Sequence, residues 1–153
     1  MNDFEVQLNN LLVDTFRTIL KVEEKMIQQS DNIPLSVSEL HLIEAAYNEG
    51  NSGKTISDIS QALGITLPSV TISVNKLVKK DFLKKEKNDE DGRSVYIYLT
   101  DKGLRINRIH NYFHKKMVDQ ISSGMTELEK RAMVSGIEKL NSFFKEKSKR
   151  MED

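Results

Sequence analysis

The chain has 153 residues and is electrically balanced, with 23 lysines and arginines against 23 aspartates and glutamates. Its 38% apolar and 30% charged residues exclude both a membrane protein and a disordered one, and the length supports a buried core. The absence of cysteine excludes disulfides, thiolate nucleophiles and cysteine metal clusters. The opening residues lack the basic n-region and the apolar h-region of a signal peptide. We therefore expect a cytoplasmic protein that does not enter a membrane.

The first part of the chain predicts one long helix and one short helix. Apolar residues recur at helical spacing from Phe4 to about Gln28, before a polar connection. The second helix begins at Ser36, whose hydroxyl suits an N-cap, and Glu39 stands three residues later to complete a capping box.

The next segment predicts a helix-turn-helix. Thr55 and Asp58 are spaced as a second capping box, and Gly64 is the expected end of that short helix. Thr66 is the expected cap of the following helix, which has Pro68 in its first turn, where the missing amide costs little.

Two strand-like runs follow, over residues 82–87 and 95–100, with the turn sequence NDEDGRS between them. They predict a β-hairpin with a charged tip. The segment from Lys76 to Lys87 carries six lysines against Asp81 and Glu86, an excess of positive charge that the balanced whole conceals.

Two long helices are expected in the last third of the chain, beginning at Thr100 and at the capping box of Thr126 and Glu129. The predicted fold class is therefore mainly α with a small β-hairpin. It is a winged helix-turn-helix over residues 36–100, with an N-terminal dimerisation helix over 1–30 and C-terminal dimerisation helices over 101–150. The apolar faces of the terminal helices exceed what the central domain can cover, which favours a homodimer.

Two linked motifs resemble the MarR family of transcriptional regulators. The first covers residues 63–85, and the second covers 89–103 with its wing signature Asp91 and Arg93 and its strand exit Leu99, Thr100 and Gly103. The resemblance implies a homodimeric repressor that binds a double-stranded DNA operator.

A helix in the major groove presents its first turns to base edges, and a wing can enter the minor groove. We therefore expect a branched apolar Ile72 to contact thymine methyl groups, which favours an A·T-rich operator. Because two copies of the chain would each read a half-site, we expect the operator to be pseudo-palindromic. Arg93 is expected in the minor groove, with Asp91 pairing with it to hold the wing. The full set of predicted DNA-binding residues is Thr66, Pro68, Ser69, Thr71, Ile72, Asn75, Lys76, Lys84, Lys85, Asp91 and Arg93.

Two effectors remain open at this point. Residues 106–133, and more loosely 22–44, resemble the fatty-acid-synthesis repressors of Gram-positive bacteria. That resemblance implies control of fatty-acid synthesis genes, with long-chain acyl groups on acyl carrier protein as corepressor. The residues that would bind this ligand are not identified by the sequence, because an acyl pocket has the same lining as any core.

Zinc is the alternative effector. His110 and His114 are spaced i, i+4 on one helix face, so both imidazoles could bind one zinc ion. His41 with Glu23 or Glu24 would complete a four-ligand site, and the predicted set of ligands is Glu24, His41, His110 and His114. This arrangement resembles the zinc-responsive branch of the same family. Half-buried or surface histidines with ordinary hydrogen bonds are the other interpretation, under which the protein has no cofactor.

An enzyme is not expected. The sequence has no glycine-rich phosphate loop, no nucleophile elbow and no paired carboxylates in apolar surroundings. A protein-binding winged-helix adaptor, with a lysine-rich wing that docks an acidic partner, is the alternative of another class.

Overall fold

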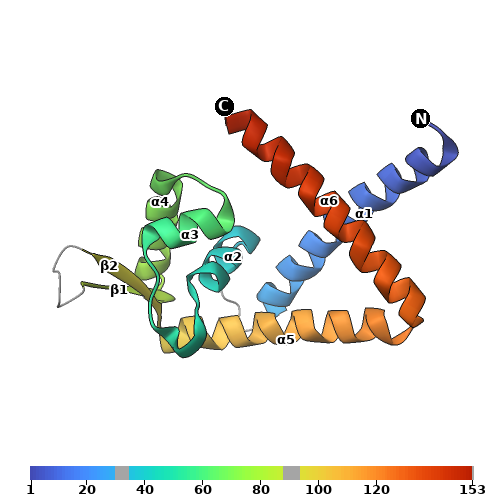
Figure 1. Cartoon of the computed structure of the whole chain (residues 1–153). Coiled ribbons are helices and arrows are strands. Elements are labelled where there is room, and N and C mark those ends of the chain that lie inside the picture. The colour runs from blue at the N-terminus through green and yellow to red at the C-terminus, as the bar shows by residue number, and fades with distance from the viewer. Residues whose placement is uncertain (30–34, 88–93, 153) are drawn as a thin grey trace. The chain divides into compact units, whose positions relative to one another are not determined.

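The computed structural model describes residues 1–29, 35–87 and 94–152. It is mainly helical with one two-stranded antiparallel sheet, which confirms the predicted fold class (Figure 1). In chain order the elements are α1 Asp3–Gln29, α2 Val37–Ala46, a 3-10 turn η1 Glu49–Asn51, α3 Ile56–Leu63, α4 Leu67–Lys79, β1 Leu83–Lys87, β2 Val95–Leu99, α5 Asp101–Ser123 and α6 Glu127–Glu152.

The chain forms two compact units, Met1–Ile109 and His110–Asp153, and the boundary between them falls inside the continuous helix α5. The predicted division at residues 30, 36 and 101 concerns what each part does, and it stays a prediction. None of the described helices has the apolar stretch that a membrane-spanning segment requires.

Local capping chemistry sets the starts of the short helices, as the sequence predicts. The Ser36 backbone amide donates to Glu39 Oε2 at 2.9 Å, and the Glu39 amide donates to the Ser36 hydroxyl at 3.2 Å. Thr55 and Asp58 form the same reciprocal pair at the start of α3. Gly64 ends α3 with a left-handed φ of 64°, a conformation that glycine adopts without strain.

The core of the first unit lies where α2, α3 and α4 meet the hairpin (Figure 1). The inward face of α4 consists of Val70, Val74 and Leu77, which recur at helical spacing and are completely buried. The end of α1 joins the same core through Ile27. The rest of the core consists of Leu35, Leu40, Leu42, Ile43, Ala46, Ile59, Phe82, Leu83, Ile97, Leu99 and Ile106.

The wing is anchored by the segment between α2 and α3. β1 and β2 pair in antiparallel register from Leu83 opposite Leu99 to Lys87 opposite Val95. The backbone of Lys54 bridges to Ile97, so a third short piece of chain adds to the sheet. The Asn51 side chain accepts from the Leu99 amide at 3.0 Å and donates to the Leu99 carbonyl at 2.9 Å, as a strand neighbour would.

The join between the wing and α5 requires a glycine at residue 103. A Cβ on Gly103 would lie 2.2 Å from the Phe82 carbonyl oxygen, far inside van der Waals contact. The Thr100 hydroxyl accepts from the Gly103 amide at 3.1 Å and donates to the Asp81 carbonyl at 2.7 Å. The Leu-Thr-x-x-Gly strand exit is therefore a helix cap combined with a close approach of two backbones.

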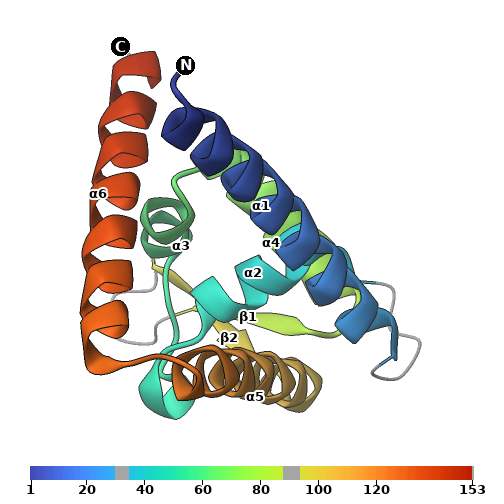
Figure 2. The same cartoon turned by 90° about the vertical axis from the view of Figure 1, so that its right-hand side faces the viewer.

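The terminal helices expose large apolar side chains. Phe16 on α1 is 68% exposed, and Phe144 on α6 is 57% exposed. Figure 2 shows α6 as a long uninterrupted helix. The further exposed large apolar residues of these helices are Phe4, Val6, Leu8, Leu11, Val13, Ile19 and Val22 on α1 and Leu128, Met133, Val134, Ile137, Phe143 and Met151 on α6.

Candidate nucleic-acid interface

The first turns of α4 present an exposed polar face, as predicted. Thr66 caps the helix, and its hydroxyl lies 2.9 Å from the Ser69 hydroxyl. Ile72 is 69% exposed, so its branched side chain is available to an apolar partner outside the chain. The predicted reading residues of this helix are all exposed, and they are Thr66, Pro68, Ser69, Thr71, Ile72, Asn75 and Lys76.

The side chains of Thr71 and Asn75 are also engaged by the fold. The Thr71 hydroxyl donates to the Leu67 carbonyl at 2.9 Å, so toward a base it serves as an acceptor. Lys85 of β1 donates to Asn75 Oδ1 at 2.5 Å, which ties α4 to the wing strand. A bidentate contact of Asn75 with adenine uses both the nitrogen and the oxygen of the amide, and the oxygen has a second lone pair beside the one that accepts from Lys85.

Lys84 of the wing is paired within its own strand. Its ammonium lies 2.6 Å from Glu86 Oε1 and 5.5 Å from the centre of the Tyr98 ring. The hydrogen bond to Glu86 raises the pKa of Lys84, so this side chain stays cationic across the physiological range. Part of its charge is nevertheless balanced by Glu86 before any phosphate arrives.

Lys76 and Lys80 converge on one carboxylate, a contact that sequence reasoning misses. Glu39 Oε1 lies 3.1 Å from Lys76 Nζ and 2.8 Å from Lys80 Nζ. Burial alone would raise the pKa of Glu39, but hydrogen bonds from Lys80, the Ser36 amide and Lys76 hold it below its usual value. The sequence identifies Glu39 only as a capping residue, because nothing local indicates a partner 41 positions away.

The predicted tip residues Asp91 and Arg93 lie outside the described residues. The strands that lead to and from them are described, and Lys84 and Lys85 are exposed on β1.

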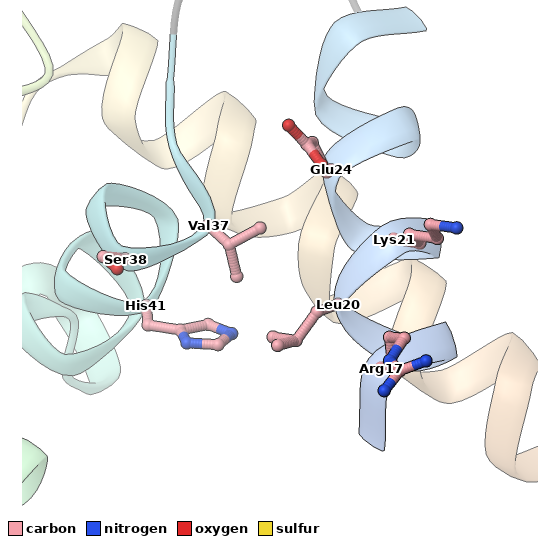
Figure 3. Close-up of a pocket in the computed structure, with 7 residues that line it drawn as sticks. All are labelled: Arg17, Leu20, Lys21, Glu24, Val37, Ser38 and His41. Carbon is pink, nitrogen blue, oxygen red and sulfur yellow. The ribbon is translucent and has the colours of Figure 1, made fainter. Parts of the chain in front are cut away.

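A pocket of about 480 Å³ opens between α1 and α2 (Figure 3). Its apolar residues are Leu20 and Val37, whose side chains project toward the space between the helices together with that of His41. The basic residues Arg17 and Lys21 come from α1, and the remaining lining residues are Glu24 and Ser38. The volume falls in the range of small-molecule sites, and the combination suits an anionic ligand with an apolar part.

The residues of the zinc alternative form two pairs, one in each compact unit. His41 Nε2 lies 3.3 Å from a carboxylate oxygen of buried Glu23, whereas Glu24 lines the pocket. The Nε2 atoms of His110 and His114 are 2.8 Å apart and hydrogen-bonded. Ligand atoms on tetrahedral zinc lie about 3.3 Å apart, so the two imidazoles would separate slightly and lose their shared proton to bind the metal. The donor types and the i, i+4 spacing fit zinc.

Comparisons with known proteins agree with this geometry. A model of the MarR family matches residues 33–94. The HTH-type transcriptional regulator YkoM of Bacillus subtilis is 32% identical over 103 residues, a match that spans 67% of this chain and 66% of YkoM, just under two thirds of its length. The HTH-type transcriptional regulator PchR of the same organism is 26% identical over 148 residues, covering 92% of this chain and 85% of PchR.

Two solved structures extend the comparison. The crystal structure of Streptococcus pneumoniae FabT in complex with DNA has a TM-score of 0.86 and 33% identity, covering 94% of this chain and 99% of that one. The Staphylococcus aureus MepR–DNA complex has a TM-score of 0.72 at 21% identity, covering 90% of this chain and 97% of that one, which is evidence for the fold alone.

Proposed function

The chain belongs to the MarR family of DNA-binding transcriptional regulators, and we propose that it is a homodimeric repressor of an A·T-rich, pseudo-palindromic operator. The observation that carries the proposal is the exposed first part of α4, where the hydroxyl residues Thr66, Ser69 and Thr71 are exposed together with Ile72. Hydroxyls bond base edges of several kinds, whereas an exposed branched side chain favours the thymine methyl group. The regulator acts in the cytoplasm and is not an enzyme.

A homodimer follows from the exposed apolar residues of the terminal helices. One winged domain reads a half-site, and a second copy one helical turn away completes a symmetric operator. Phe16 of α1 and Phe144 of α6 are mostly exposed in the single chain. Burying such side chains against a second copy stabilises the pair and spaces its two α4 helices.

The DNA contacts are tested first at the wing. We expect Arg93→Ala to weaken operator binding by ~1–3 kcal/mol, the usual loss of one good contact. The probe is a duplex that the wild-type protein selects from random sequences, with binding measured by fluorescence anisotropy. Unchanged affinity would remove the wing tip from the interface.

Salt dependence separates the repressor from the protein-binding adaptor. A nonspecific basic patch loses affinity steeply as salt rises, because its binding comes from counterion release. We expect the selected duplex to be preferred over a scrambled one at ~200 mM salt. Loss of all sequence preference at that salt would favour the adaptor.

Regulation by long-chain acyl groups on acyl carrier protein is the effector proposal. It is supported by the similarity to FabT over nearly the whole chain and by the resemblance of residues 106–133 to fatty-acid-synthesis repressors. The pocket between α1 and α2 supports a ligand-responsive regulator, because it joins apolar Leu20 and Val37 to basic Arg17 and Lys21. Under this proposal the acylated carrier protein tightens operator binding and so represses fatty-acid synthesis genes.

Zinc is kept as the second effector, because the Glu23–His41 and His110–His114 pairs carry suitable ligand atoms. Operator binding is titrated separately with acylated carrier protein and with zinc, using His110→Ala as the control. Tightening by the acylated protein in both variants supports the lipid effector. If zinc tightens operator binding in the wild type but not in His110→Ala, zinc and not the acylated carrier protein is the effector.

A further inference from the structure

Glu39 connects the start of α2 to the outer surface of α4. Its carboxylate is buried, with 7% of the side chain exposed, yet it reaches Lys76, whose side chain is 62% exposed. Lys80 donates to both carboxylate oxygens, at 2.8 and 2.9 Å, and the Ser36 amide donates to Oε2. The carboxylate therefore keeps three bonds to the fold even without Lys76.

The Glu39 contact leaves Lys76 with spare donors. A lysine ammonium has three N–H groups, and the oxygen of Glu39 accepts one of them at 3.1 Å. A free lysine side chain samples many rotamers, whereas one anchored at its end is held in a small volume. The ammonium of Lys76 is thus held near Glu39 although its side chain is 62% exposed, which leaves its remaining N–H groups for an acceptor outside the chain.

We propose that Glu39 is a positioning residue for operator recognition, which holds the Lys76 ammonium on the exposed face of α4 for one defined acceptor on the DNA. The inference rests on the proposed contact of Lys76 with the operator. Lys80 holds the carboxylate in place, and Lys76 is the partner that faces the DNA. Such an arrangement raises sequence selectivity, because a lysine without Glu39 would bond any nearby phosphate.

The test is Glu39→Gln, measured as the ratio of affinity for the selected duplex to affinity for a scrambled duplex of the same length. Glutamine at this position also completes a capping box with Ser36, so α2 keeps its start. We expect the ratio to fall by about 5-fold. The salt slope for the scrambled duplex should steepen by up to ~1, since one lysine regains its full charge.

A matched control removes one carboxylate elsewhere. Glu129 occupies the same place in the capping box of α6, where the Thr126 amide donates to it at 2.8 Å, and none of its described contacts is with a lysine. Glu129→Gln should leave the selectivity ratio unchanged. An equal fall in both variants would show that charge loss alone is responsible, and it would overturn the assignment.

A double variant decides whether Glu39 acts through Lys76. Lys76→Ala should weaken binding to the selected duplex, and in that background Glu39→Gln should no longer change the ratio. If Lys76→Ala leaves binding to the selected duplex unchanged, the contact and the inference both fail. If Lys76→Ala weakens binding but Glu39→Gln changes both affinities by one common factor, the contact stands and the positioning role of Glu39 is overturned.

Discussion

The winged part of the chain and the terminal helices differ in how much of their apolar side chains is exposed. In the first, α2, α3, α4 and the hairpin bury most of their large apolar residues against one another, and Ile72 and Leu67 of α4 are exposed exceptions. In the second, the first two thirds of α1 and most of α6 leave aromatic and branched side chains exposed. A self-contained core lets the winged part keep a polar face for DNA, whereas the apolar residues of the terminal helices stay exposed in the single chain and would be covered by a second copy in the proposed homodimer.

The largest expected effect comes from breaking the self-contained region. Gly103→Ala places a Cβ against the Phe82 carbonyl, so we expect the free energy of unfolding to fall by about 3 kcal/mol. Gly136→Ala in α6 is the matched control, since a Cβ there meets nothing within 4 Å, and it should stabilise the helix by ~0.5–1 kcal/mol. Urea denaturation compares the two, and similar stabilities would contradict the close approach at Gly103.

The next effect concerns completion by a second chain. Phe16→Asp places a charge on the exposed apolar side of α1, and we expect the dimer dissociation constant to rise roughly 100-fold. Asp14→Asn on the same helix should leave the dimer intact. Sedimentation equilibrium at micromolar concentration gives the mass, and a wild-type mass of one chain would refute the comparison outright.

A smaller effect is expected from removing the N-cap residue of one helix in each region. Thr55 starts α3 and Thr126 starts α6 through the same reciprocal bonds. Each alanine variant should lose ~1 kcal/mol of stability. We expect only Thr126→Ala to weaken dimerisation, as followed by the concentration dependence of the melting temperature. Equal weakening by both variants would mean that the two regions do not act separately.

The smallest effect is the pH dependence at Glu39. Burial opposes its charge, but the bonds from Lys80, Ser36 and Lys76 hold its pKa below the ordinary 4.5. A lowered pKa in the folded state gives stability that is present above about pH 4.5 and is lost as pH falls through the folded-state value. Urea midpoints between pH 7 and about pH 3 should therefore fall less in Glu39→Gln than in the wild type. An identical fall would show that the lysine bonds contribute no stability.

Local chemistry explains why so much of the fold is readable in the sequence. Capping at Ser36, Thr55 and Thr126 involves residues three positions apart, and the turn at Gly64 needs one glycine. The inward stripe of α4 follows from helical periodicity. The exposed reading face on the same helix is the complement of that stripe, so the sequence predicts it equally well.

The sequence by itself determined the element order, the helix starts and the family motifs, because each depends on residues that are close together in the chain. Only the tertiary structure decided that Glu39 meets Lys76 and Lys80, that Asn51 pairs with the Leu99 backbone, and that Lys85 reaches Asn75. These partners lie on different elements of the fold. Periodicity and capping patterns describe one segment at a time, so the pairing of polar groups between segments appears only when the core brings the segments together.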